Sequence, residues 1–474
     1  MEKTLAIVLV VYLFGVMGVA VFANRKIQNE EDYIVAGRRL PAWMATFTLF
    51  ATWFGAGTLL TATNEIRSEG LRVSLLEPYG SGAALLLAGW FFAGPLWHEK
   101  LCTLSDLYRR RFGRGVEVTS VLISVPGYIG WIAVQLISLA QIADLIFHIP
   151  VQYGIGGIAV FTAVYTYIGG MWSVTLTDVI QFFFVVLGLV VLGYEVFVHL
   201  GEGNLFTGVT SVLQNADPAD LVILPRESWG ELFSWVSVFV AASIGNIPGQ
   251  DLAQRIFSSN SEKTAKRSCF WAGILYIGLG TIPVLLGLAA KEVLPAEVTD
   301  AIIPALGLKF LTPTLIVILV LGLISVILST LDSAILAPAS TLARNLLRGV
   351  VPERVPTLLL LHFSVFLITL SSTVLAYLGE DAYSLLESSY AMSLVGLFVP
   401  LVASLYIKSP DAKSVIASMI TGIGIWAVGT FGFDGDAPIS LIAVLAAFAA
   451  FCLAHLYWAR EWPRFCRYHY RESA

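Results

Sequence analysis

One apolar segment of the chain carries hydroxyl and carboxylate side chains near its centre. It reads Leu328-Ser329-Thr330-Leu331-Asp332-Ser333. Hydroxyls at such a position usually bond back to their own helix, but a carboxylate at membrane depth is costly unless it is paired or faces water. Hard oxygen atoms suit a small, hard cation. Val326 precedes Ser329 by three residues, so the two share a helical face with Thr330 beside them. The pattern predicts a cation site, and bonding within the helix is the alternative.

A second apolar segment, at about residues 41–63, has glycines near its middle. It reads Phe50-Ala51-Thr52-Trp53-Phe54-Gly55-Ala56-Gly57-Thr58-Leu59-Leu60-Thr61. Glycine lets a membrane helix unwind, and the freed carbonyls can then coordinate a cation. Ala51 and Phe54 lie three residues apart before the glycines, so their carbonyls can point the same way. Close helix packing through small residues is the alternative.

Two further stretches interrupt the apolar pattern. Residues 169–178 join two spans and begin with Gly-Gly, which permits a tight turn. Thr177 or Asp178 either caps the following helix, or Asp178 lies in a cytoplasmic cavity on the exit path of an ion. Residues 245–251 read Gly-Asn-Ile-Pro-Gly-Gln-Asp, which indicates either a helix end at the interface or a second broken helix. This break comes five spans after the first, where an inverted repeat of five helices places it.

The elements that position these residues must be membrane helices. Of the 474 residues, 57% are hydrophobic and 13% charged, and the mean hydropathy is +0.80. The charged share is about half that of a soluble domain, and the apolar residues come in runs of about 20, the length that crosses a bilayer core of about 30 Å. The composition therefore excludes a soluble fold.

We expect an all-α membrane protein with about thirteen spans. They lie at about 4–23, 41–63, 75–96, 118–146, 154–170, 176–199, 231–248, 269–290, 313–340, 356–378, 384–406, 412–431 and 438–459. With the N-terminus outside, all but six of the 28 Lys and Arg fall in cytoplasmic segments, as the positive-inside rule requires. The six exceptions are Lys3, Arg67, Arg72, Arg226, Lys291 and Lys309. The charges thus predict a cell-membrane protein with an outside N-terminus and an inside C-terminus.

These segments resemble the sodium:solute symporter family over most of the chain, from Asp32-Tyr33-Ile34-Val35-Ala36-Gly37-Arg38 to about residue 406. Residues 169–178 and the run Gln254-Arg255-Ile256-Phe257-Ser258-Ser259 match family signatures. The resemblance implies a single transporter domain over 1–474. Its LeuT-type core would consist of two inverted five-helix repeats, 41–199 and 231–406, flanked by helices at 4–23, 412–431 and 438–459.

The same resemblance implies a symporter that couples sodium entry to import of a small organic solute by alternating access. The co-transported sodium ion would lie between the second and ninth spans. Its implied ligands are the carbonyls of Ala51, Phe54 and Val326 and the side-chain oxygens of Ser329 and Thr330. Asp178 matches a family aspartate near the sodium exit path.

Within the family, several segments are most similar to the high-affinity choline transporter branch. They are Phe47-Thr48-Leu49-Phe50-Ala51-Thr52-Trp53, then Ser329-Thr330-Leu331-Asp332-Ser333-Ala334-Ile335-Leu336, and Ala343-Arg344-Asn345. In that branch aromatic residues line the pocket for a quaternary ammonium, which is attracted to the faces of aromatic rings. The resemblance implies substrate contacts at Trp53, Gly57, Thr58, Trp131, Gly249 and Gln250. Core packing is the alternative role for either Trp. The branch has an aromatic residue where this chain has Gly249, so a different substrate stays open.

Other solutes and one other class stay open. The symported solute can be an amino acid such as proline, pantothenate, a monocarboxylate or a sugar. A channel is the alternative of another class, although two breaks five spans apart favour alternating access. We expect no enzyme, because no cluster of ionisable residues lies at one interface, and no sensor, because only a short segment follows the last span. The expected partners are the solute, sodium and the lipid bilayer, without nucleic acid or an obligate protein partner.

Overall fold

The computed structural model describes residues 2–469 except 226–227, 380, 409 and 433–436. This part of the chain is helical and contains no strand, only an isolated bridge between Leu40 and Ser259. The all-α class predicted from the sequence is therefore confirmed. The α-helices are α1 Glu2–Asn24, α2 Glu30–Val35, α3 Ala42–Trp53, α4 Ala62–Glu69, α5 Ser81–Leu87, α6 Ala93–Glu99, α7 Leu104–Phe112, α8 Arg114–Phe147, α9 Val151–Leu200, α10 Leu205–Asn215, α11 Trp229–Ser243, α12 Gln250–Ser258, α13 Glu262–Val293, α14 Ile302–Phe310, α15 Pro313–Thr341, α16 Thr357–Leu378, α17 Ala382–Ser393, α18 Val399–Tyr406, α19 Ala412–Gly432 and α20 Ile439–His469.

Short 3₁₀ and π segments interrupt or extend these helices. They are η1 Ala36–Arg38, η2 Gly57–Thr61, η3 Leu71–Leu75, η4 Leu76–Gly80, η5 Ala88–Phe92, η6 Leu342–Leu346, η7 Leu347–Gly349 and η8 Leu394–Phe398. π-Helical turns inside helices are frequent at functional sites. Two of them, η2 and η4, lie where the sequence predicts the first break and the start of the third span.

The number of spans is less than the sequence predicts when each helix is counted by length and apolarity. Ten helices of the described residues can cross a membrane, or eleven when the bent pair α3 and η2–α4 counts as one. The 50-residue α9 covers two predicted spans as one element. A break at Gly170 (φ 50°, ψ −156°) separates its two halves. α11 has 15 residues, fewer than the roughly 20 that cross a bilayer. The count of thirteen therefore stays a prediction.

The centre of the bundle is α15. It starts with proline in the first turn, where the missing N–H is not needed, and its residues 319–341 are buried on every side. A helix that is apolar all round belongs in a core. It packs on α9, α8, α16 and α3, so the hydroxyls near its middle face other helices rather than lipid.

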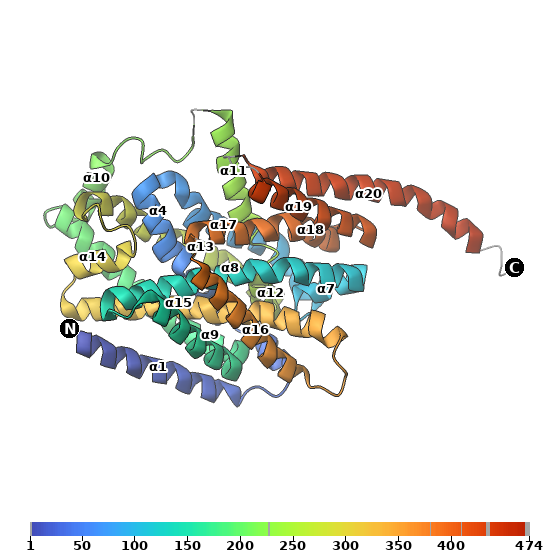
Figure 1. Ribbon diagram of the computed structural model, residues 1–474, viewed down its shortest axis with the longest axis horizontal. Coiled ribbons are helices and arrows are strands. Elements are labelled where there is room, and N and C mark those ends of the chain that lie inside the picture. Colours follow the sequence, from blue (N-terminus) through green and yellow to red (C-terminus); the bar gives the residue numbers. More distant parts are fainter. Residues whose placement is uncertain (1, 226–227, 380, 409, 433–436, 470–474) are drawn as a thin grey trace.

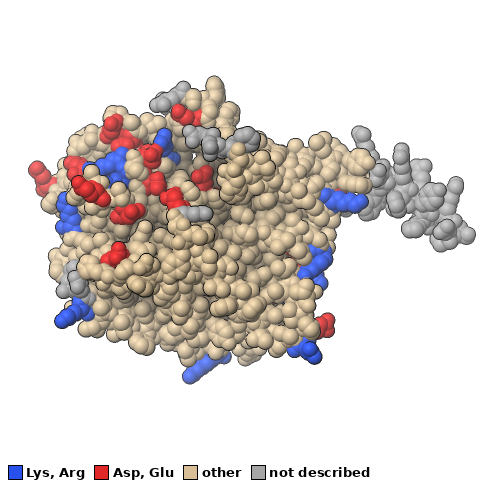
Figure 2. Space-filling model, viewed as in Figure 1, with Lys and Arg blue, Asp and Glu red and all other residues tan. Residues whose placement is uncertain are grey.

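The periphery is built from helices with exposed apolar faces. α1 lies beside α9 at the edge of the bundle, and α19 and α20 pack together at another edge, as Figure 1 shows. Phe14 of α1 is 75% exposed, which suits contact with lipid. In Figure 2 acidic side chains gather at one end of the visible face, over α4, α10 and α14, while the middle of that face is nearly free of charge. This distribution fits a bundle that crosses a bilayer.

Candidate functional site

The second predicted span breaks at its middle. α3 ends at Trp53, Phe54 leaves the helical conformation (ψ 65°), and the axes before and after the break differ by 55°. A Cβ added to Gly55 would lie 2.5 Å from Thr330 Oγ1 and 2.8 Å from Gln135 Oε1. Gln135 accepts a hydrogen bond of 2.9 Å from the backbone N–H of Ala56, a donor that the break releases. Glycine is needed here because the unwound backbone touches both α15 and α8.

Residues predicted to bind sodium meet where this break contacts α15. Ser329 Oγ and Thr330 Oγ1 each lie 3.2 Å from the carbonyl oxygen of Ala51. Thr330 Oγ1 also lies 3.1 Å from the carbonyl oxygen of Val326. Phe54, the fifth predicted ligand, ends α3 three residues after Ala51, and all five residues are fully buried. The structure thus gathers carbonyl and hydroxyl oxygens, the hard ligands that a sodium ion prefers.

Asp178 lies inside a helix and does not cap one. The chain resumes helical conformation directly after Gly170, so of the two alternatives left open by the sequence, the one in which Thr177 or Asp178 caps the next helix is wrong. Ser329 donates a hydrogen bond of 2.5 Å to Asp178 Oδ1, and Thr48 donates to Oδ2. The fully buried carboxylate therefore adjoins the predicted sodium ligands through Ser329.

A second set of polar contacts ties α12 to α3 and α15. The guanidinium of Arg255, which is fully buried, donates to Ser333 Oγ at 2.5 Å. Ser333 Oγ lies 3.2 Å from Thr52 Oγ1. Asp332 accepts from Thr166 Oγ1 at 3.3 Å. The family signature around Arg255 therefore connects the second break to the helix that carries Ser329 and Thr330.

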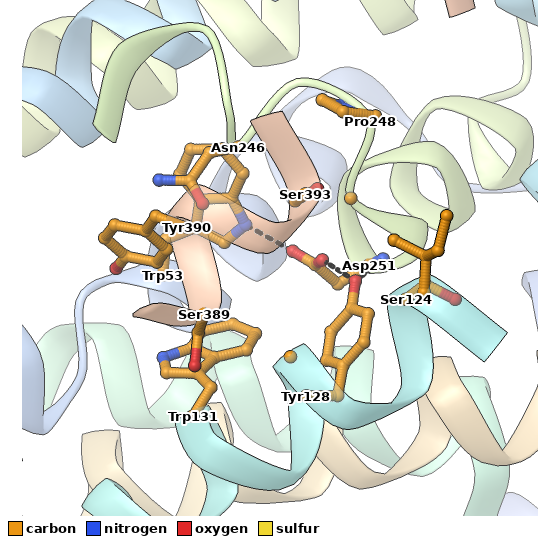
Figure 3. Close-up of a pocket in the computed structure, with 13 residues that line it drawn as sticks. Trp53, Ser124, Tyr128, Trp131, Asn246, Pro248, Asp251, Ser389, Tyr390 and Ser393 are labelled. Atoms are coloured by element: carbon orange, nitrogen blue, oxygen red, sulfur yellow. Dashed lines mark hydrogen bonds between the residues drawn. The ribbon is translucent and has the colours of Figure 1, made fainter. Parts of the chain in front are cut away.

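A pocket lies between α3, α8, α12 and α17, beside the first break. About 570 Å³ of space not filled by atoms lies within it, including space that is open to solvent. Its lining residues are Trp53, Ile123, Ser124, Gly127, Tyr128, Trp131, Asn246, Pro248, Gly249, Asp251, Ser389, Tyr390 and Ser393. Figure 3 shows aromatic rings from three helices around a central carboxylate.

That carboxylate belongs to Asp251, which is only 3% exposed. The indole N–H of Trp53 donates to Oδ2, and the hydroxyl of Tyr128 donates to Oδ1, as the dashed lines of Figure 3 mark. The backbone N–H of Asp251 donates to the Tyr128 oxygen at 3.1 Å. The N-terminal turn of α12 places Asp251 here, because the second break ends at Gly249 and the helix begins at Gln250. The hydrogen bonds fix the orientation of the carboxylate and leave lone pairs for a ligand.

The six predicted substrate residues fall into two groups. Trp53, Trp131 and Gly249 line the pocket, whereas Gly57, Thr58 and Gln250 are not among its lining residues. Gln250 accepts from the backbone N–H of Leu104 at 2.7 Å and donates to the carbonyl of Cys102 at 3.2 Å, so it holds the chain before α7. Gly57 packs against Leu386, and Thr58 contacts Glu77 at 2.9 Å.

The sequence reasoning missed three residues of this region. Asp251 ends the quoted second break, and Tyr128 lies one helical turn before Trp131 on α8, yet neither was assigned a role. Glu77 lies at the start of the third predicted span and is 2% exposed. An acidic residue inside an apolar span is a functional signal by itself, and this signal applies to Glu77, whereas Asp251 lies three residues after the seventh predicted span.

The family model of the sodium:solute symporters ("Sodium:solute symporter family") matches residues 33–422. This chain belongs to the sodium:solute symporter family. The high affinity choline transporter 1 of Homo sapiens is 25% identical over 442 residues, which cover 88% of this chain and 75% of that protein. The sodium/glucose cotransporter of Vibrio parahaemolyticus is 27% identical over 297 residues, covering 60% of this chain and 54% of that protein.

Solved structures confirm the fold of this symporter. A Na⁺-coupled sialic acid symporter in a substrate-bound, outward-open state matches with a TM-score of 0.81 at 19% identity, covering 95% of this chain and 97% of that one. Mhp1, a nucleobase-cation-symport-1 family transporter, matches with a TM-score of 0.60 at 13% identity, covering 90% and 94%. The LeuT-type fold predicted from the sequence is confirmed, as is the prediction of a multi-pass membrane protein that imports a solute with sodium.

Proposed function

We propose that this symporter imports a cationic amine, choline or a related quaternary amine, together with sodium. The observation that carries the proposal is the Asp251 carboxylate in the pocket, with Trp53, Tyr128, Trp131 and Tyr390 around it. An ammonium group is attracted by aromatic faces and by a carboxylate whose charge is little screened in a buried site. Similarity to the choline transporters supports the same class.

The charges of the pocket argue against the anionic alternatives. Among its lining residues, all of which the structure describes, Asp251 is the one carboxylic acid, and there is no Lys, Arg or His. Pantothenate and a monocarboxylate would place a second carboxylate beside Asp251. Arg255, the buried cation that interacts with Asp251, also interacts with Asp178 and does not line the pocket, so the second carboxylate would have no cationic partner among the lining residues. Proline would bring its ammonium to Asp251 but would leave its own carboxylate unpaired. A sugar could donate hydrogen bonds to the carboxylate, but it has no positive charge to be attracted by the aromatic faces.

The sodium ion of the proposal lies at Ala51, Phe54, Val326, Ser329 and Thr330, and Asp178 lies on its exit path. The contacts of Ser329 and Thr330 with the Ala51 carbonyl support the site, whereas the contact of Thr330 with the Val326 carbonyl is also the bond within the helix that the sequence left as the alternative. The bond from Ser329 to Asp178 supports the path. We further propose alternating access of two inverted repeats at about 41–199 and 231–406. The proposed topology has an outside N-terminus and an inside C-terminus. A C-terminal reporter that is active only outside the cell would refute this orientation.

A solute screen with the purified protein tests the substrate class. Proteoliposomes are loaded without sodium and diluted into sodium or potassium medium containing labelled choline. Unlabelled betaine, proline, pantothenate, lactate and glucose are added as competitors. The proposal expects sodium-dependent choline uptake that proline, pantothenate, lactate and glucose do not inhibit. Betaine has a quaternary ammonium but also an unpaired carboxylate, so it should inhibit more weakly than unlabelled choline. Each of these solutes is then offered in labelled form, and sodium-dependent uptake of one of them, with choline inert, would refute the substrate class while leaving sodium symport intact.

A further inference from the structure

Glu77 lies in a closed cluster of hydroxyl groups beside the first break. Thr58 Oγ1 and the Tyr276 hydroxyl lie 2.9 Å and 2.8 Å from Oε2. Ser81 Oγ and the Tyr390 hydroxyl each lie 2.6 Å from Oε1. The four partners come from η2, α13, α5 and α17, and the carboxyl group is almost completely buried.

The cluster contains more short contacts than hydroxyl protons. In addition to the four contacts with Glu77, Thr58 Oγ1 lies 2.6 Å from the Tyr276 hydroxyl, which itself lies 2.9 Å from the carbonyl oxygen of Trp53. Each hydroxyl has one proton to donate, and a carbonyl has none. An ionised Glu77 therefore leaves two of these contacts without a proton. A proton on Glu77 supplies one more donor.

That proton also sets which group donates and which accepts in each hydrogen bond of the cluster. With Oε2 protonated, Glu77 donates to Thr58, Thr58 donates to Tyr276, and Tyr276 donates to the carbonyl of Trp53. Ser81 and Tyr390 still donate to Oε1. When Glu77 is ionised, Thr58 and Tyr276 both donate to Oε2, because bonds to a charged acceptor are stronger, and the Trp53 carbonyl loses its donor. The protonation state of Glu77 is thus transmitted to the backbone between Ala51 and Phe54.

We propose that Glu77 is a proton-binding site of this symporter and that its proton is linked to sodium binding at the break. The negative charge left on Glu77 attracts sodium, whereas the hydrogen bond to Trp53 only helps to hold the backbone. Two unit charges on the order of 10 Å apart at an effective dielectric constant of about 20 change a dissociation constant by roughly ten-fold. A single neutral hydrogen bond contributes less. The electrostatic effect therefore prevails, and sodium binding favours release of the proton.

Two titratable side chains contact Glu77, and the charged residues on the surrounding elements lie farther away or bond elsewhere. Tyr276 and Tyr390 contact it directly, and Asp251 lies beyond Tyr390 in the pocket, bonded to Trp53 and Tyr128. Charged residues also lie on the elements packed against η4 and its cluster: Glu65, Arg67, Glu69, Arg72, Glu231, Asp251, Arg255, Glu262, Lys263, Lys266, Arg267, Lys291, Glu292 and Glu387. Among the described residues, no Lys, Arg or His is hydrogen-bonded or ion-paired to Glu77. No basic side chain therefore neutralises Glu77 in this arrangement, and a proton on the carboxylate would do so.

Sodium binding by the purified protein tests the proposal without any solute, so the result does not depend on which solute is carried. The sodium dissociation constant is measured by tryptophan fluorescence from about pH 5 to about pH 9, for the wild type and for Glu77→Gln. The wild-type constant should rise roughly ten-fold as pH falls through the titration of Glu77. The Gln variant should lose that component and keep the weaker affinity of the protonated form. Sodium added in weak buffer should release more protons from the wild type than from the variant.

Two further variants make the test decisive. Glu69→Gln removes an exposed carboxylate and should keep the wild-type pH dependence. Tyr276→Phe removes a donor to the ionised form, so it should shift the pH midpoint of sodium affinity upward. An unaltered pH dependence and an unaltered proton release in Glu77→Gln would overturn the proposal. If Glu77→Gln does not fold, an unchanged midpoint in Tyr276→Phe would overturn it.

Discussion

Ser329 donates a hydrogen bond of 2.5 Å to the carboxylate of Asp178. The same hydroxyl oxygen lies 3.2 Å from the carbonyl oxygen of Ala51 at the end of the broken helix. One side chain therefore touches both the proposed sodium ligands and the proposed exit path. Because Ser329 is fully buried, these contacts are little screened by water, and changes at either partner should alter sodium binding.

Alanine at either hydroxyl position should weaken sodium coupling. Ser329→Ala and Thr330→Ala each remove one oxygen ligand, so each should raise the sodium concentration for half-maximal uptake by about ten-fold. Thr330→Ser keeps the oxygen and should have a smaller effect. Because coupling is reciprocal at equilibrium, the affinity for the solute at fixed sodium should also fall. A double alanine variant that reaches the membrane and keeps the wild-type sodium dependence would show that the site is wrong.

Loss of the Asp178 charge should also raise the sodium concentration for half-maximal uptake. Asp178→Asn preserves the shape of the side chain but removes the negative charge beside Ser329. The sodium concentration for half-maximal transport should rise several-fold, because an opposite charge stabilises a cation nearby. Asp144→Asn on the exposed end of α8 is the matched control and should behave as wild type. Equal sodium dependence in Asp178→Asn and the control would remove Asp178 from the ion path.

Asp251 and Trp53 should determine recognition of the solute. Asp251→Asn should raise the KM for choline at least ten-fold, because the charge that attracts the ammonium is lost. Trp53→Phe keeps an aromatic face and should be milder than Trp53→Ala, which removes it. The measurement is initial uptake at saturating sodium, with surface expression of each variant as the control. If Asp251→Asn leaves the choline KM unchanged, the carboxylate does not recognise the amine.

Gly55→Ala should damage the break itself. The new Cβ would approach Thr330 Oγ1 to 2.5 Å, so the unwound backbone or Thr330 must shift, at a cost of about 1–3 kcal/mol. Thermal denaturation of the purified protein with and without sodium measures both effects. We expect a lower melting temperature and little stabilisation by sodium. Gly278→Ala in α13, where a Cβ meets nothing within 4 Å, should keep both properties. A sodium response in Gly55→Ala equal to that of Gly278→Ala would contradict the role of this glycine.

Much of the membrane architecture follows from local properties of the sequence. Runs of apolar residues require helices in a bilayer, and this alone predicts the class. Gly55 and the Pro-Gly pair at 248–249 correctly mark non-helical backbone, whereas Gly57 is already the first residue of the π-helical segment η2. The span count is harder to predict, because the break at Gly170 leaves the two halves of α9 joined, whereas the sequence suggested a linker there.

The pocket could be predicted only in part. Trp53, Trp131 and Gly249 were expected from similarity to the choline transporters, and they line the pocket. Asp251 and Tyr128 lie 123 residues apart in sequence, on two different helices, and nothing local to either residue indicates that they meet. Gln250 lies between two pocket residues in sequence and Thr58 follows Trp53 by five residues, but their side chains contact Leu104 and Glu77 instead. Side-chain direction at a break depends on tertiary packing and not on spacing.

The most direct test of sodium-coupled import of a cationic amine is accumulation of labelled choline in proteoliposomes under an inward sodium gradient. The account predicts that internal choline rises above the external concentration, and that it falls back when the gradient is collapsed by a sodium ionophore. Asp251→Asn liposomes serve as the matched control and should accumulate far less at the same choline concentration. Choline that only equilibrates across the membrane, at a rate independent of sodium, would contradict the account and indicate a channel.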